Sequence, residues 1–98
     1  MTRADIIASL RRNADAVRGM GATALYLYGS AARDQAGAAS DLDLFIDYDP
    51  DSRFNAFDLV GIKLFLEERL QMPVDIATRD CLHPRLRARI EQSATPIF

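Results

Sequence analysis

The sequence has little of what several classes of protein require. One cysteine, Cys81, cannot form an internal disulfide bond, and with a single histidine, His83, it falls short of the ligand count of a zinc site. The formal net charge of −2 argues against a positive field that would draw the chain to nucleic acid. No apolar run approaches the roughly 20 residues that span a bilayer, and Asp5 and Arg11 interrupt any signal-peptide core. We therefore expect a protein of the reducing cytoplasm that binds neither a membrane nor nucleic acid directly.

What the sequence does have is the composition of one globular domain. The chain is 98 residues long, with 49% hydrophobic and 27% charged residues, a balance typical of folded soluble domains. About 100 residues can enclose one modest core, and the chain shows no internal repeat or linker. We expect a single domain over residues 1–98.

Hydrophobic periodicity predicts an alternation of helices and strands. The region 29–39 is small and polar, which favours a short helix and then a loop. Helix 54–71 carries apolar residues on most of its circumference, so we expect it to be buried on more than one side. The order favours an α+β fold, a small mixed β-sheet with helices packed mainly on one face. The expected helices are 4–18, 54–71 and 80–93, and the expected strands are 22–28, 42–48 and 74–78.

Three aspartates carry the strongest chemical signal. Asp41 and Asp43 are two residues apart at the start of a strand, so their carboxylates leave the same face while Leu42 and Leu44 point to the core. Asp75 repeats this pattern in a later strand. Neighbouring carboxylates repel each other unless a cation lies between them, and Mg²⁺ is held by one or two carboxylates together with phosphate oxygens. The alternative is a set of solvated aspartates at a strand edge, which an isolated Asp-x-Asp would favour.

A glycine-serine turn precedes these aspartates. Gly29 and Ser30 end a strand and begin a short helical stretch, where backbone N–H groups can meet phosphate and glycine lets the backbone approach closely. Arg33, one turn later, is either a phosphate contact or an ordinary surface residue. Together the turn and the three carboxylates predict a nucleotide and metal site.

The combination resembles the minimal nucleotidyltransferase domain, a small member of the polymerase-β-like superfamily. That family combines a hydrophobic residue and Gly-Ser with Asp-hydrophobic-Asp about a dozen residues later, and a third carboxylate on a later strand. The resemblance covers nearly the whole chain. It is carried by Tyr28-Gly29-Ser30-Ala31-Ala32-Arg33, Ser40-Asp41-Leu42-Asp43-Leu44, Val74-Asp75-Ile76, the stretch Pro84–Arg87 and the end Pro96-Ile97-Phe98.

The resemblance implies a site, a cofactor and a partner. By it, Gly29 and Ser30 hold the triphosphate of ATP, Asp41 and Asp43 bind Mg²⁺, with two ions expected, and Asp75 completes the catalytic and metal-binding set. Similar solitary domains act as antitoxins that transfer AMP onto a tyrosine of a HEPN-domain toxin. The sequence departs from the family at Asp34, where glycine is usual, and a side chain with negative charge there would slow or alter catalysis.

Two other functions compete with this one. The chain could neutralise a toxin by binding alone, with a footprint on apolar surface between Phe54 and Leu70 or around Leu82. Transfer to a small molecule, as in the similar aminoglycoside nucleotidyltransferases, needs room for the acceptor that 98 residues do not give, although a homodimer would supply it. A homo-oligomer or a hetero-oligomer with the toxin is compatible with either function.

The remaining charged and aromatic residues have plainer interpretations. The aspartates around Pro50 are expected to serve turns and solvation, and Lys63 to be a surface lysine or a phosphate contact. The arginines near the C-terminal helix form a solvated face or a surface for an acidic partner. Two tyrosines and Phe45 are expected to be packing residues, one of which could flank a nucleobase. The aspartates are Asp47, Asp49 and Asp51, the arginines are Arg79, Arg85, Arg87 and Arg89, and the tyrosines are Tyr26 and Tyr28.

Overall fold

The structure, a computed structural model, describes residues 2–29 and 41–98. The predicted short helix and loop of 29–39 therefore lie outside the described residues, apart from Gly29. The elements are α1 (Arg3–Arg12), α2 (Ala14–Gly19), β1 (Ala22–Tyr28), β2 (Leu42–Tyr48), α3 (Ala56–Leu70), β3 (Val74–Thr78), the 3₁₀ turn η1 (Arg79–Cys81), α4 (Arg87–Ser93) and β4 (Thr95–Pro96).

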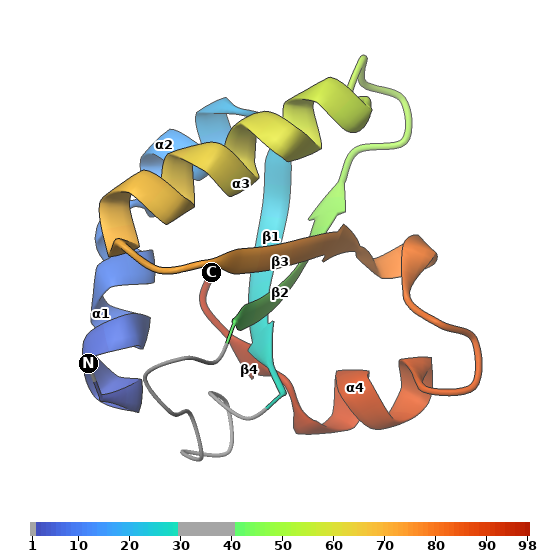
Figure 1. The fold of residues 1–98 in the computed structure, drawn as a ribbon. Helices are drawn as coiled ribbons and strands as arrows, with labels where there is room; N and C mark the ends of the chain where they lie inside the picture. The colour runs from blue at the N-terminus through green and yellow to red at the C-terminus, as the bar shows by residue number, and fades with distance from the viewer. Residues whose placement is uncertain (1, 30–40) are drawn as a thin grey trace.

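The strands form one mixed sheet in the order β3-β2-β1-β4. β2 pairs antiparallel with β1 and parallel with β3, and β4 pairs antiparallel with β1. Figure 1 shows α1, α2 and α3 on one side of the sheet, with α4 set apart from them near β4. The predicted α+β fold is confirmed, and so are the three strands 22–28, 42–48 and 74–78.

The core lies between the sheet and the first three helices. Alternate residues of β1 and β2 are fully buried, as the two-residue period of a strand requires. Helix α1 starts from a capping box in which Thr2 and Asp5 bond each other's backbone N–H groups, and α3 starts from a similar box at Asn55 and Asp58. The buried residues of this core are Ile6, Ile7, Leu10, Val17, Ala22, Leu25, Leu27, Leu42, Leu44, Ile46, Ile62, Leu66, Leu70, Val74 and Ile97.

Two helix predictions were wrong in their boundaries. The expected helix 4–18 is broken at Asn13, whose side-chain amide donates to the carbonyl of Ser9 at 2.7 Å. The expected helix 80–93 begins as η1 and becomes α-helical only at Arg87, because Pro84 has no N–H to donate and disfavours the helical conformation of His83. The periodicity of hydrophobic residues does not predict either of these interruptions.

The prediction that helix 54–71 is buried on more than one side was also wrong. Only the stripe Ile62, Leu66 and Leu70 is buried, because the sheet covers one side of α3. On the opposite side Phe57 is 87% exposed and Leu64 is 58% exposed. The outer face of α3 is therefore an exposed apolar stripe.

No helix among residues 2–29 and 41–98 is long and apolar enough to cross a membrane.

Candidate active site

The three aspartates lie at one end of the sheet. Asp43 and Asp75 are Cα partners in the parallel pairing of β2 with β3, so their side chains leave the same face side by side. Asp41 precedes β2 by one residue and is exposed. On the other side of Asp43, its Cα partner in β1 is Tyr28. We call Asp75, Asp43 and Tyr28 the carboxylate row.

Gly29 follows β1 directly beside this row. Its φ is +76°, a conformation that residues with a side chain rarely adopt. A Cβ atom added to Gly29 would clash with the Asp43 carboxylate. The glycine thus allows the backbone to pass close to Asp43. Ser30 and Arg33, the other predicted phosphate contacts, lie outside the described residues, as does Asp34.

The groups at this end of the sheet act on one another through their charges. Burial, then the charge of Asp75, then that of Asp41 raise the pKa of the Asp43 carboxyl. Burial first, followed by the charges of Asp43 and Asp75, raises the pKa of Tyr28. A negative charge is therefore poorly compensated at Asp43.

The donor set fits a hard cation that brings other ligands with it. Asp43 and Asp75 offer carboxylate oxygens to one space, and Mg²⁺ commonly takes one or two carboxylates and fills its sphere with water and phosphate oxygens. Within the described part of the chain, no three His, Cys, Asp or Glu side chains come together closely enough to hold a metal on their own. A cation held by Asp43 and Asp75 would complete its coordination with oxygens from water or phosphate.

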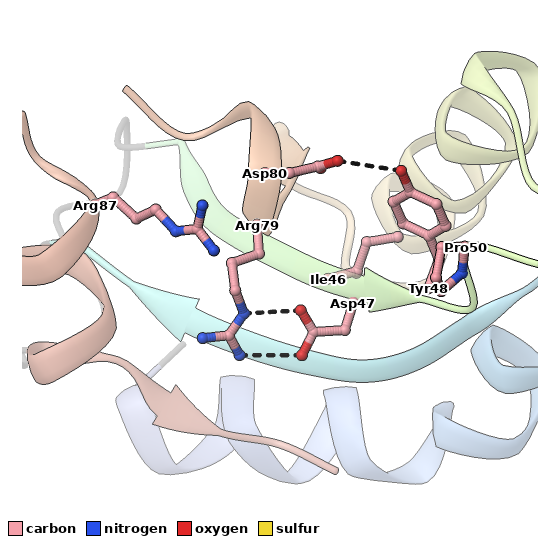
Figure 2. A pocket seen from close by; sticks show the side chains of 7 residues that line it. All are labelled: Ile46, Asp47, Tyr48, Pro50, Arg79, Asp80 and Arg87. Atoms are coloured by element: carbon pink, nitrogen blue, oxygen red, sulfur yellow. Dashed lines mark hydrogen bonds and ion pairs between the residues drawn. The ribbon is translucent and has the colours of Figure 1, made fainter. Parts of the chain in front are cut away.

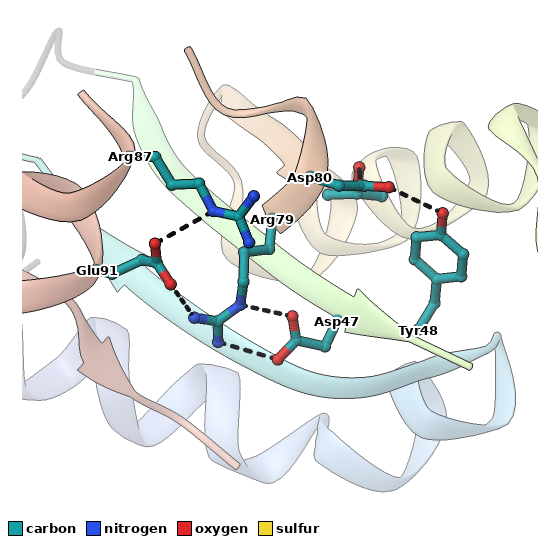
Figure 3. A network of polar contacts seen from close by, with 7 residues as sticks. Asp47, Tyr48, Arg79, Asp80, Arg87 and Glu91 are labelled. Carbon is teal, nitrogen blue, oxygen red and sulfur yellow. Dashed lines mark hydrogen bonds and ion pairs between the residues drawn. The ribbon is translucent and has the colours of Figure 1, made fainter. Parts of the chain in front are cut away.

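The same sheet face continues into an aromatic cluster and then an ion-pair network. Phe45 is fully buried and stacks on Tyr26 with ring centroids 4.7 Å apart. Arg79 lies over both rings. It donates two hydrogen bonds of 2.8 and 3.0 Å to the Asp47 carboxylate, which are drawn in Figure 3. It also donates to Glu91 of α4.

Two residues of this network were misjudged from the sequence. Asp47 was expected to serve a turn, yet it lies within β2 and pairs with Arg79. Arg79 was expected on a solvated face, yet its side chain is only 26% exposed. The alternation of 42–48 already places Asp47 on the face of Asp43 and Phe45, which was the available signal. The partner of Asp47 could not be read from the sequence.

A cavity of about 250 Å³ opens beside this network (Figure 2). Asp47, which lines the cavity, is four residues from Asp43 along β2, a separation of about 13 Å at the usual rise of a strand. Its polar groups largely satisfy one another, because Asp47 pairs with Arg79 and Tyr48 donates to Asp80. The carboxylate row therefore remains the better candidate for chemistry. The cavity is lined by Ile46, Asp47, Tyr48, Pro50, Arg79, Asp80 and Arg87.

Glu67 fixes the start of the strand that carries Asp75. Its carboxylate accepts the backbone N–H of Val74 at 2.9 Å and lies 3.3 Å from the Lys63 ammonium. The backbone hydrogen bond, and then the contacts with Lys63, lower the pKa of Glu67. Lys63 is thus an ion-pair partner within α3, in line with the surface interpretation of that residue.

We expect Glu67→Gln to lower stability at neutral pH and to remove a pH dependence. A carboxyl whose pKa is lowered by folding stabilises the native state above its unfolded pKa, and that contribution is lost as the pH falls through its folded pKa. The difference in urea midpoint between wild type and Glu67→Gln should therefore be full at pH 7 and shrink below about pH 4.5. Glu68→Gln, at an exposed neighbouring position, is the matched control and should show no such difference. Equal midpoints for wild type and Glu67→Gln at pH 7 would contradict the expectation.

Comparison with protein families agrees with this geometry. The model of the nucleotidyltransferase domain matches residues 10–97. The chain belongs to this family. "Putative protein adenylyltransferase MJ0435" of Methanocaldococcus jannaschii is 33% identical over 72 residues, which are 74% of this chain and 75% of that protein.

Solved structures support the same family and fold. One described as a "putative minimal nucleotidyltransferase" is 34% identical, covers 92% of this chain and 94% of its own, and has a TM-score of 0.74. A toxin-antitoxin structure with AMP-PNP covers all of this chain and 73% of its own, with 17% identity and a TM-score of 0.69. The second likeness shows a shared fold only. The nucleotidyltransferase fold predicted from the sequence is confirmed.

Proposed function

We propose that this nucleotidyltransferase transfers AMP from ATP to a hydroxyl group, a tyrosine in our expectation, of a HEPN-domain toxin and thereby acts as its antitoxin. The observation that carries the proposal is the pairing of Asp43 with Asp75 beside the close-approach glycine, Gly29. The name of the relative from M. jannaschii, a protein adenylyltransferase, supports a protein as acceptor. The toxin-antitoxin structure with AMP-PNP, which shares this fold, supports an adenine nucleotide as substrate and a toxin as partner.

The chemistry assigns a role to each residue. Backbone N–H groups at Gly29 and Ser30 bind the phosphates, and Arg33 adds a positive charge to them. Asp41 and Asp43 would hold Mg²⁺, and Asp75 would either accept the proton of the attacking hydroxyl or help to hold a second ion. When bound, Mg²⁺ neutralises phosphate charge and orients the triphosphate.

The reaction itself is a single displacement. The acceptor oxygen forms a bond to the α-phosphorus of ATP while the bond from that phosphorus to the bridging oxygen breaks. Pyrophosphate leaves, and the hydroxyl proton passes to a base, a role that the proposal gives to Asp75. Burial, and then the charges of Asp75 and Asp41, raise the pKa of Asp43, so a cation beside Asp43 would stabilise its ionised form.

The test is the transfer of label from α-labelled ATP to the co-purified partner. A mass increase of one AMP on the partner, abolished by EDTA and restored by Mg²⁺, is the expected result. Peptide mapping then identifies the modified residue. A well-folded wild-type chain that leaves its bound partner unmodified would overturn the proposal and favour neutralisation by binding alone.

One observation favours that second function or a contribution from it. Phe57, Val60 and Leu64 form the exposed stripe on the outer face of α3, away from the carboxylate row. Exposed large apolar side chains at a helical spacing are typical of a surface that a partner covers. The stripe lies within the segment that the sequence predicted as a binding footprint.

We expect Phe57→Glu and Leu64→Glu each to weaken partner binding by about tenfold or more, because a charge would have to be desolvated in an apolar contact. Isothermal titration with the purified partner measures the loss. Leu86→Glu, at an exposed leucine that precedes α4, is the matched control and should bind like wild type. Unchanged affinity in both α3 variants would show that the partner binds elsewhere.

A further inference from the structure

The face of the sheet opposite α1, α2 and α3 is organised in three parallel rows. Strand pairing places residues of β3, β2 and β1 side by side, and every second residue along each strand faces this side. The carboxylate row comes first, an aromatic row second and an ion-pair row third. The aromatic row is Ala77, Phe45 and Tyr26, and the ion-pair row is Arg79 and Asp47.

Arg79 connects the ion-pair row to the aromatic row. Its Nε and Nη2 atoms donate to the two carboxylate oxygens of Asp47, which fixes the plane of the guanidinium. In that plane its Cζ atom lies 4.9 Å from the ring centre of Tyr26 and 5.1 Å from that of Phe45. A lysine ammonium lacks the planar fork that holds both carboxylate oxygens of Asp47, so it cannot make these hydrogen bonds and lie over both rings at the same time.

The aromatic row in turn packs against the carboxylate row. Phe45 lies two residues beyond Asp43 on the same face of β2, and its ring is 5.7 Å from that of Tyr28. Tyr28 is the cross-strand partner of Asp43 and ends the strand that leads into Gly29. Because the Phe45 ring is fully buried between these groups, it cannot shift without moving what surrounds Asp43.

We propose that Arg79 is a positioning residue for nucleotidyl transfer, acting through Phe45 and Tyr26 to hold Tyr28 and the Asp43 carboxylate in place. The inference rests on the proposed function, since it assigns Arg79 a share in that reaction. Arg79 lies two rows away from Asp43 on the sheet, so it acts on the carboxylate row through its neighbours. Residues that support metal-binding side chains from behind typically contribute about tenfold to a hundredfold to activity.

The competing role for Arg79 is to fasten α4. Its Nη1 atom donates to Glu91, which also accepts from Arg87, so the network joins α4 to the sheet (Figure 3). The two roles separate by substitution. Glu91→Gln weakens the attachment of α4 and leaves the paired hydrogen bonds to Asp47 and the ring contacts in place. Arg79→Lys keeps a positive charge but removes the paired hydrogen bonds to Asp47 that set the cation over the two rings.

The experiment compares Arg79→Lys, Glu91→Gln and Arg87→Lys in the labelling assay with the full chain and its partner. We expect Arg79→Lys to lower kcat by about tenfold or more and to change the KM for ATP by less than about threefold. Glu91→Gln and Arg87→Lys should keep kcat within about twofold of wild type. In the metal-free and nucleotide-free chain, the ring proton resonances of Tyr28 should shift in Arg79→Lys and stay in place in Glu91→Gln.

Two results would overturn the inference. One is a kcat for Arg79→Lys within about twofold of wild type, and the other is an equal loss in Glu91→Gln, which would assign Arg79 to the fastening of α4. If Arg79→Lys does not fold, Asp47→Asn replaces it in the experiment. That variant keeps Arg79 and weakens only its paired hydrogen bonds to residue 47. An inactive wild type would contradict the proposed function, and the Tyr28 resonances would still decide whether Arg79 orders the carboxylate row.

Discussion

Asp43→Asn is expected to reduce AMP transfer by about 10³-fold or more while the chain stays folded. The asparagine keeps the size of the side chain and one oxygen, and it loses the negative charge that would hold Mg²⁺. A metal that stabilises phosphate charge contributes several kcal/mol to the transition state, which corresponds to this loss of rate. The initial rate of label transfer at saturating ATP and Mg²⁺ measures it.

The same substitution should leave the fold intact or make it more stable in the absence of metal. Burial and the charges of Asp75 and Asp41 raise the pKa of Asp43, so folding disfavours its ionised form near neutral pH. A neutral amide removes that cost. Urea unfolding in EDTA should therefore give a midpoint for Asp43→Asn no lower than that of wild type.

Asp51→Asn is the matched control for Asp43→Asn. Asp51 is an exposed aspartate in the turn that follows β2, beyond the end of the strand opposite to Asp43. The variant should transfer AMP at the wild-type rate. A transfer rate for Asp43→Asn close to that of Asp51→Asn would remove Asp43 from the proposed mechanism.

Gly29→Ala is expected to have the second-largest effect, on both stability and activity. A side chain at a φ of +76° is strained, and the added Cβ would press on the Asp43 carboxylate. Strain of this kind costs about 1–3 kcal/mol, and a displacement of about 1 Å at a reacting group costs about a hundredfold in rate. Thermal unfolding and the labelling assay measure the two effects on the same preparation.

Gly19→Ala provides the matched control for Gly29→Ala. Gly19 lies in the last turn of α2, with nothing within 4 Å of an added Cβ. Alanine is a better helix former than glycine by about 0.5–1 kcal/mol, so this variant should be slightly more stable and fully active. If both glycine variants behaved alike, the close approach of Gly29 to Asp43 would have no part in the site.

The sequence predicted the strands better than the helices, for a physical reason. Each strand has one buried and one open face, so 22–28 and 42–48 show an alternation that a helix cannot produce. The same alternation placed the aspartates opposite the core, which is how the convergence of Asp43 and Asp75 could be expected from the sequence. Their roles in catalysis stay predictions.

What the sequence did not predict depends on contacts between distant segments. β4 is two residues long and owes its place to β1, where Ile97 donates to the carbonyl of Leu25 at 2.8 Å. The apolar circumference of α3 suggested burial all around, and only the position of the sheet decides which side is covered. The pairing of Arg79 with Asp47 spans 32 residues, a separation that no local pattern encodes.

The place of β3 at the edge of the sheet has a consequence for the choice of acceptor. Asp75 is exposed and stands at the rim, so a bulky macromolecule can bring a hydroxyl alongside without entering a deep cleft. In the proposed reaction, an exposed site would also let water attack the α-phosphorus of ATP in place of the acceptor hydroxyl. A bound target protein would exclude water from the site, so the hydrolysis of ATP should decrease when the target is bound.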